Sequence, residues 1–228
     1  MGYFRPVKAA IAILTGDIVG SAKSAEKQIW LVRLKRAMKQ LESLCILNKD
    51  NWEIYRGDSF QLSLEEPKQA LRAVLVIRAA LKALPLFEEM DMDVRISIGI
   101  GVRDFEGDRV SESDGPAYHY SGHGLDEIEK DERRLIIKSD WPDLDDEMRV
   151  NLSLAEVILS NWSAASAEVC WHLFREDITQ KELAVKLGIS QPAVNKRIAR
   201  AHLEEILLLE QRFRNRVSIL QAEEKAKD

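Results

Sequence analysis

Thr179–Ala201 reads TQKELAVKLGISQPAVNKRIARA, and this stretch predicts two short helices joined by a sharp turn. Thr179 and Glu182 have the spacing of a capping box, in which each side chain satisfies a free backbone donor at the start of a helix. Gly188 permits the left-handed backbone that a tight turn after a helix requires. Ser190 is a favourable N-cap for the second helix. The stretch therefore predicts a helix-turn-helix.

The second of these helices carries side chains that suit the major groove of DNA. Its outward residues are expected to be Gln191, Ala193, Asn195, Lys196, Arg197 and Arg200. Asn and Gln can read adenine edges, Arg and Lys bind guanine or phosphate, and a helix N-terminus favours phosphate. The whole chain has a formal net charge of -5, so any contact with DNA must come from a local basic surface. The alternative is a three-helix module used only for protein contact or dimerisation.

A further helix is expected from Leu203 to Leu220. Its apolar residues form one stripe, made of Ile206, Leu209, Phe213, Val217 and Leu220. Packing of this stripe onto the rest of the chain is the default interpretation. Self-association into a homodimer is the alternative, and an operator read by a dimer would need it.

Upstream of this region, residues 1–139 predict an α+β domain in which strands and helices alternate. The expected strands are Val7–Leu14, Trp52–Tyr55, Phe60–Leu64, Val94–Val102 and Arg134–Lys138. The expected helices are Ser24–Asn48, a helix opened by Pro67, and Ala117–Ile128. The acidic residues 140–150 are expected to form a linker, and residues 151–228 an all-α domain that contains the helix-turn-helix at 179–201.

The residues of the expected strand Val94–Val102 alternate between an apolar face and a face that is nearly bare of large side chains. Val and Ile occupy the first face, and Arg95, Ser97, Gly99 and Gly101 occupy the second. A bare face lets another backbone or a ligand approach closely.

Two aspartates follow or interrupt predicted strands. Asp17 stands at the end of the first strand, in GDIVGS, and Asp58 stands in the Arg56–Ser59 turn between two short strands. Both motifs resemble the metal motifs of class III nucleotide cyclases. That resemblance implies a ferredoxin-like, palm-type domain, with Asp17, Asp58 and the backbone carbonyl of Ile18 as ligands of Mg²⁺ or Mn²⁺. Ordinary turn chemistry is the alternative reading of both aspartates.

The resemblance also implies nucleotide contacts, although the chain departs from the cyclase pattern there. The implied nucleotide-binding residues are Gly20, Ser21, Gly57, His119 and His123. Where the cyclases carry a purine-selecting Lys, this chain has Ile54, and histidines replace their late Asn and Arg. A neutral imidazole cannot supply the permanent charge of Arg.

Two further resemblances concern larger parts of the chain. The 179–201 stretch is similar to the helix-turn-helix of sigma-factor region 4 and of the LuxR type. Gly16–Ser21, the GDSFQ turn at 57–61 and the C-terminal helix-turn-helix together resemble the SatD family over nearly the full length. That resemblance implies a two-domain protein, and it does not supply a reaction.

These patterns leave three hypotheses about function. The first is a DNA-binding regulator whose degenerate cyclase-like domain binds a metal or a nucleotide, and which is not an enzyme. The second is a metal-dependent nucleotide cyclase or nucleotidyl-transfer enzyme, and the third is a non-enzymatic protein-interaction module. Cys45 and Cys170 lie far apart without a metal-binding spacing, which favours two buried thiols and a reducing cytoplasm. No apolar run is long enough to cross a bilayer, so no membrane contact is expected.

Overall fold

The computed structural model describes residues 9–19, 24–83, 92–131 and 133–227 of the chain. Within these residues it contains one five-stranded sheet and eight helices, so the α+β expectation is confirmed. The strands are β1 (Ile11–Val19), β2 (Trp52–Arg56), β3 (Ser59–Leu64), β4 (Asp93–Gly101) and β5 (Leu135–Ser139). The helices are α1 (Ser24–Ser43), α2 (Ala70–Lys82), α3 (Pro116–Asp131), α4 (Pro142–Ser160), α5 (Ala164–Leu173), α6 (Gln180–Leu187), α7 (Gln191–Arg200) and α8 (Leu203–Lys225). Two 3₁₀ turns, η1 (Pro67–Gln69) and η2 (Val110–Glu112), precede α2 and α3.

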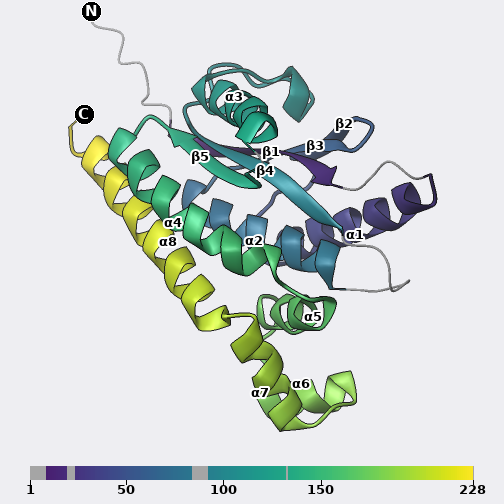
Figure 1. Ribbon diagram of the computed structural model, residues 1–228. Helices are drawn as coiled ribbons and strands as arrows, with labels where there is room; N and C mark the ends of the chain where they lie inside the picture. The colour runs from purple at the N-terminus through teal and green to yellow at the C-terminus, as the bar shows by residue number, and fades with distance from the viewer. Residues whose placement is uncertain (1–8, 20–23, 84–91, 132, 228) are drawn as a thin grey trace, which may run out of the picture.

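The sheet has the strand order β2-β3-β1-β4-β5, with β1 at its centre. All neighbouring strands are antiparallel except β4 and β5, which are parallel. Helix α3 covers one face, and α1, α2 and α4 lie on the other, with α8 outside them (Figure 1). Within the described residues, no helix combines the length and the apolar composition that a bilayer span requires.

Strand β1 is longer at its carboxyl end than the sequence predicts. It continues past Leu14 and through Gly16 to Val19, because β3 and β4 pair with it on both sides up to Asp17. Gly16 fits there because the backbone of Arg95 and the ring of Phe60 lie against it, each 2.7 Å from where a Cβ would stand. Asp17 is therefore inside a central strand and not in the turn that follows it.

The residues of β1 divide by parity between two cores. Ala12, Leu14 and Ile18 belong to the main hydrophobic cluster, which α1 and α2 cover. Ile11 and Ile13 face α3. Because the side chains of a strand alternate, Thr15 and Asp17 share the α3 face.

Helix α3 packs directly on the face of β4 that carries the glycines. A Cβ added at Gly99 would stand 2.1 Å from the carbonyl oxygen of Ala117 and 2.5 Å from the amide nitrogen of Ser121. The same closeness recurs at Gly124 of α3, where a Cβ would stand 2.1 Å from Ser97 Oγ. The close approach predicted for this face is therefore made by a helix backbone, so at Gly99 this face holds no open ligand site.

The expected linker is largely helical. From Pro142 onward, residues 140–150 form the first half of α4, whose buried Leu144 and Met148 join the main hydrophobic cluster. The acids there occupy a helix N-terminus, and Asp145 accepts hydrogen bonds from the backbone and hydroxyl of Ser139. The acidic residues and the proline suggest a linker, but the apolar Leu144 and Met148 among them pack into the core and keep the segment helical.

The apolar stripe of α8 packs against its own chain. Ile206, Phe213 and Val217 are buried in the main cluster, and Leu209 and Leu220 pack beside it. This matches the default interpretation of the stripe and leaves it unavailable to a second copy.

The two cysteines differ in environment. Cys170 is buried in α5, and burial raises the pKa of its thiol to about 12. Cys45 is exposed just beyond the end of α1, with a φ of 55°. The expectation of two buried thiols is therefore wrong for Cys45, because α1 ends two residues before it.

Candidate functional site

The two aspartates singled out by the sequence lie close to one another. Asp17 is paired across the β1–β3 ladder with Ser59, the residue that follows Asp58. Asp17 is only 7 % exposed, and its carboxyl oxygen Oδ1 is buried with no hydrogen-bond partner among the described residues. Burial raises the pKa of Asp17, and the negative charges of Glu129 and Asp58 add to this rise. Pairing of β1 with β3 therefore brings Asp17 and Asp58 together, although they lie far apart in the sequence.

Asp17 already has a cationic partner. Arg95 stands directly opposite it on β4, and its Nη2 and Nε donate to Oδ2 of Asp17 at 2.6 and 3.1 Å. This ion pair lowers the pKa of Asp17 and so opposes the effect of burial, although it does not outweigh it. Sequence reasoning placed Arg95 on the bare strand face but did not bring it to Asp17, because the β1–β4 register decides that meeting.

A chain of polar side chains extends from the same site into the space between the sheet and α3. Gln61 donates from Nε2 to Thr15 Oγ1 at 2.9 Å, and Thr15 donates to Ser121 Oγ at 2.9 Å. Ser121 in turn donates to the carbonyl of Tyr118 at 2.9 Å. These residues fix the α3 face of β1 beside Asp17.

The donor set at Asp17 can be compared with what a divalent cation requires. Two neighbouring carboxylates and an unpaired buried oxygen are suitable donors for a hard cation. However, the guanidinium of Arg95 already contacts Oδ2. No group of three or more His, Cys, Asp or Glu able to hold a metal occurs in the described part of the chain. With Arg95 in this position, the arrangement does not fit a resident divalent ion.

Ile18 and Gly57 are direct chain neighbours of the two aspartates. The side chain of Ile18 is buried in the main cluster, which does not test the role expected of its backbone carbonyl. Gly57 is exposed at the β2–β3 turn with a φ of 49°. Gly20 and Ser21 lie outside the described residues.

The two histidines point elsewhere. His119 and His123 are exposed on the outer side of α3, with ring centroids 6.5 Å apart. His119 contacts Asp114 at 2.6 Å. The face of α3 that meets the sheet carries Ala117 and Ser121 instead. His119 and His123 therefore lie on the face of α3 opposite the one that meets the sheet, and the structure does not bring them to Asp17.

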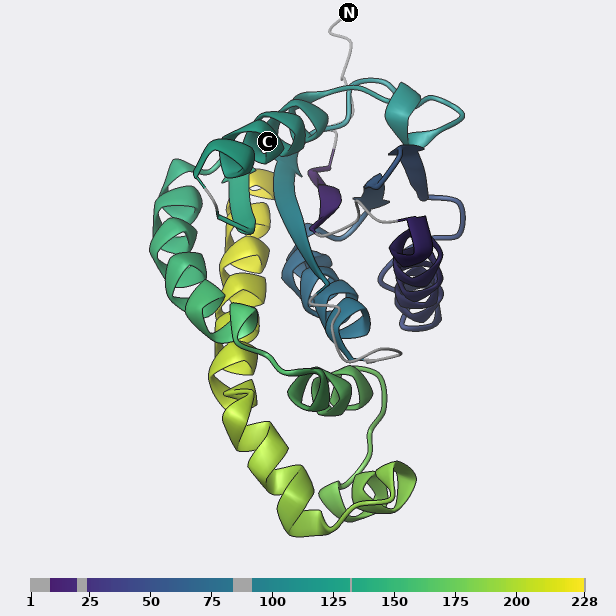
Figure 2. The same ribbon diagram turned by 45° about the vertical axis from the view of Figure 1, so that its right-hand side comes forward.

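The helix pair at 179–201 forms with the predicted caps. Thr179 and Glu182 make the capping box, Gly188 ends α6 with a φ of 65°, and the Ser190 side chain accepts from the backbone of Ala193. Leu183, Ala184 and Val194 form a small core with Val169 of α5. Figures 1 and 2 both place α6 and α7 at the end of the molecule away from the sheet.

The side chains expected to contact DNA divide into two groups. Gln191, Asn195, Lys196 and Arg200 are exposed on α7. Ala193 and Arg197 are only half exposed, because this flank of α7 faces α5, where Arg197 Nη1 pairs with Glu168 Oε2 at 2.9 Å. The side chain of Arg197 is thus engaged by an ion pair with α5, which the helical spacing alone does not predict.

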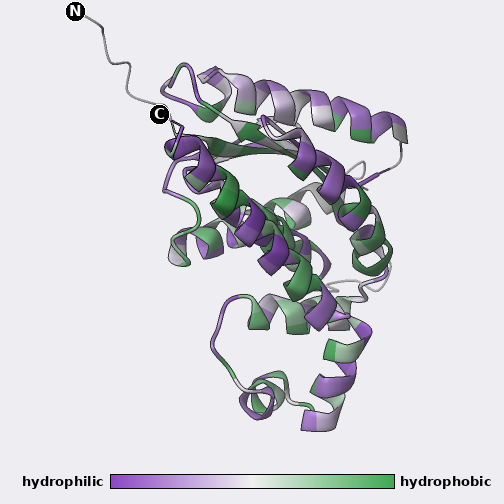
Figure 3. Cartoon of the chain, turned by 90° about the vertical axis from the view of Figure 1, so that its left-hand side faces the viewer, coloured by the Kyte–Doolittle hydropathy of each residue, from purple (hydrophilic) through white to green (hydrophobic). Residues whose placement is uncertain are grey.

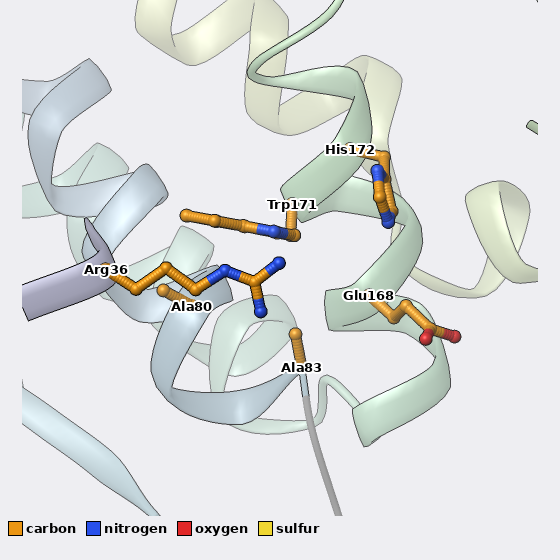
Figure 4. Close-up of a pocket in the computed structure, with 6 residues that line it drawn as sticks. All are labelled: Arg36, Ala80, Ala83, Glu168, Trp171 and His172. Atoms are coloured by element: carbon orange, nitrogen blue, oxygen red, sulfur yellow. The ribbon is translucent and has the colours of Figure 1, made fainter. Parts of the chain in front are cut away.

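Helix α5 connects the α6–α7 pair to the helices under the sheet. Trp171 is buried, and two guanidinium groups lie over its ring, that of Arg36 of α1 at 5.3 Å and that of Arg175 at 4.6 Å from the ring centroid. Figure 4 shows Arg36 lying along the ring, with Glu168 and His172 beyond it. The pocket between them has a volume of about 30 Å³, which is room for a water molecule and not for a nucleotide.

A protein-family model matches the chain. The SatD family model matches residues 10–216, which covers most of the chain. The chain belongs to the SatD family. No curated protein matches it. The matched SatD range includes both aspartates, Arg95 and the whole of α7.

Proposed function

We propose that this protein is a DNA-binding regulator that contacts DNA through α7. The observation that carries the proposal is the composition of α7 in its setting. It contains Lys196, Arg197 and Arg200 and no acidic residue, and its N-terminal turn is exposed at the end of the molecule. In such a helix the polar residues nearer the N-terminus, here Gln191 and Asn195, would meet base edges, and the basic residues farther along, Lys196 and Arg200, would meet phosphates.

The connection between α6 and α7 supports the same proposal. The αL glycine at 188, the capped start at Ser190 and the support of α7 by α5 are the elements of a helix-turn-helix. Figure 3 shows this helix pair below the rest of the molecule, so that α7 is not covered by the sheet or by α3. A duplex can therefore reach the exposed residues of α7.

For the sheet region we propose a degenerate, cyclase-like unit that binds a ligand and does not catalyse a reaction. The order β2-β3-β1-β4 with antiparallel neighbours supports a ferredoxin-like arrangement. The neighbouring Asp17 and Asp58 support common ancestry with the cyclase metal site. The Arg95 ion pair and the outward histidines argue against cyclase chemistry. A nucleotide remains the predicted ligand.

The DNA proposal is tested by fluorescence anisotropy with a labelled duplex of mixed sequence, titrated with salt. Each phosphate that the protein neutralises contributes about 0.9 to the slope of log K against log salt concentration. We expect K196A/R200A to weaken binding and to reduce the slope by nearly 2.

The matched control is K225A/K227A, which removes two exposed lysines at or just beyond the far end of α8. This variant should retain the affinity and slope of the wild type. Equal slopes for the two double variants would show that α7 does not contact the phosphates and would overturn the proposal.

A further inference from the structure

The Asp17–Arg95 pair occupies the position that the cyclase resemblance assigns to a metal ion. Both Arg95 contacts, at 2.6 and 3.1 Å, are made to the single oxygen Oδ2. The other oxygen, Oδ1, is buried and has no hydrogen-bond partner among the described residues. A carboxylate on a residue that is 7 % exposed, with only one of its oxygens satisfied, has an unused coordination position.

The surroundings of Asp17 increase the demand for positive charge. Asp58 lies at the neighbouring turn, and Glu129 of α3 also acts on Asp17 electrostatically. Two further negative charges therefore act on a carboxylate beside which the structure places one guanidinium. Arg95 carries a single permanent charge, and its side chain is 31 % exposed, so it can be exchanged without opening the main core.

A guanidinium and a divalent ion compete for this position. A divalent ion on Oδ1 and the guanidinium on Oδ2 would lie on the same carboxylate, and their repulsion is strong in the partly desolvated space between the sheet and α3. The alternation of β4 also fixes Arg95 on the α3 face, so it stays beside Asp17 as long as the register holds.

We propose that Arg95 is the resident cation of Asp17 and excludes divalent ions from the Asp17–Asp58 position. The chain thus has a metal-type carboxylate pair in which a built-in guanidinium replaces the metal. This inference does not depend on DNA contact by α7. It also explains how the aspartates of the cyclase motif can persist without metal-dependent chemistry.

The test measures Mn²⁺ binding to the purified full chain from the loss of the electron paramagnetic resonance signal of free Mn²⁺. We expect no Asp17-dependent binding in the wild type or in R95K, which keeps the positive charge. R95Q should bind Mn²⁺ at least about tenfold more tightly than the wild type, because it removes a unit charge beside a divalent ion. The double variant D17N/R95Q should lose that binding.

Two results would overturn the proposal. The first is wild-type Mn²⁺ binding as tight as that of R95Q and abolished by D17N, since Arg95 would then exclude nothing. The second is no binding in folded R95Q, since Asp17 would then be no cation site. Circular dichroism checks the fold of each variant, and R95M, which keeps much of the aliphatic stem, replaces R95Q if R95Q does not fold. The first of these results comes in part from comparing the wild type with D17N, and that comparison does not depend on the folding of any Arg95 variant.

Discussion

Asp93 is a fully buried acid at the start of β4 whose charge is balanced by three basic side chains. Arg78, Arg134 and Lys82 approach its Oδ2 to 2.9, 2.7 and 3.2 Å. Arg78 also pairs with Glu156 of α4 at 2.6 Å, so the cluster links α2, β4 and α4. Burial opposes ionisation of Asp93, but the charges of Arg78 and Lys82 outweigh it and hold the pKa of Asp93 below its usual value.

Asp93→Asn should therefore lower the free energy of unfolding at neutral pH by about 3–5 kcal/mol, because it leaves buried cations without their counter-ion. A carboxyl whose pKa is lowered by folding stabilises the protein above its unfolded pKa of 3.8 and loses that contribution as the pH falls through the folded value. The difference between wild type and variant should thus be largest near neutral pH and shrink in acid. Urea unfolding over a pH series measures it.

The control is Asp146→Asn, which removes an exposed acid paired with Arg149 on the same helix. It should leave stability almost unchanged at every pH. A difference between wild type and Asp93→Asn that grows as the pH falls would mean that folding raises the pKa of Asp93, contrary to this prediction.

At the residue scale, the sequence predicts which residues are candidates for a site better than it predicts which side chains contact one another. Asp17 and Asp58 are singled out by their motifs and do lie close together. The Arg95 partner and the Glu168 pairing of Arg197 depend on strand register and on helix packing, which no local pattern contains.

Among the elements, α3 and β4 approach each other so closely that only glycine fits between their backbones. Gly99→Ala should destabilise the protein by roughly 1–3 kcal/mol or more, because its Cβ would collide with the backbone of α3 at Ala117 and Ser121. Thermal unfolding followed by circular dichroism measures the loss.

Gly122→Ala on the same helix is the matched control, since nothing lies within 4 Å of its added Cβ. It should be neutral or stabilise the protein by up to about 1 kcal/mol, because alanine favours a helix over glycine. Equal losses for both substitutions would show that α3 does not rest on Gly99.

Most elements could be predicted from periodicity and caps. Strands β2 and β3, helices α2 and α3 and the capping box of α6 lie within a few residues of their expected positions. The carboxyl end of β1 and the start of α4 could not, because pairing on both sides carries Gly16 through the strand, and burial of Leu144 and Met148 orders an acidic segment.

Over the whole molecule, one hydrophobic cluster crosses the boundary expected at residue 140. It joins β1 and α2 to Leu152 of α4, Trp171 of α5 and Phe213 of α8. Two smaller clusters of the described residues stand apart from it: the one between β1 and α3, with Ile13 and Ala117, and the α6–α7 core with Val169. Packing is therefore continuous from the sheet region to α5, and α5 in turn supports α7.

The most direct test of DNA contact by α7 is an amide nitrogen–proton correlation spectrum of the full chain, recorded by nuclear magnetic resonance during titration with a short DNA duplex. We expect the largest shifts in α7, at Gln191, Asn195, Lys196 and Arg200, with α3 and the free end of α8 unaffected. Shifts that leave α7 untouched while duplex binding is detected elsewhere on the molecule would contradict the proposal.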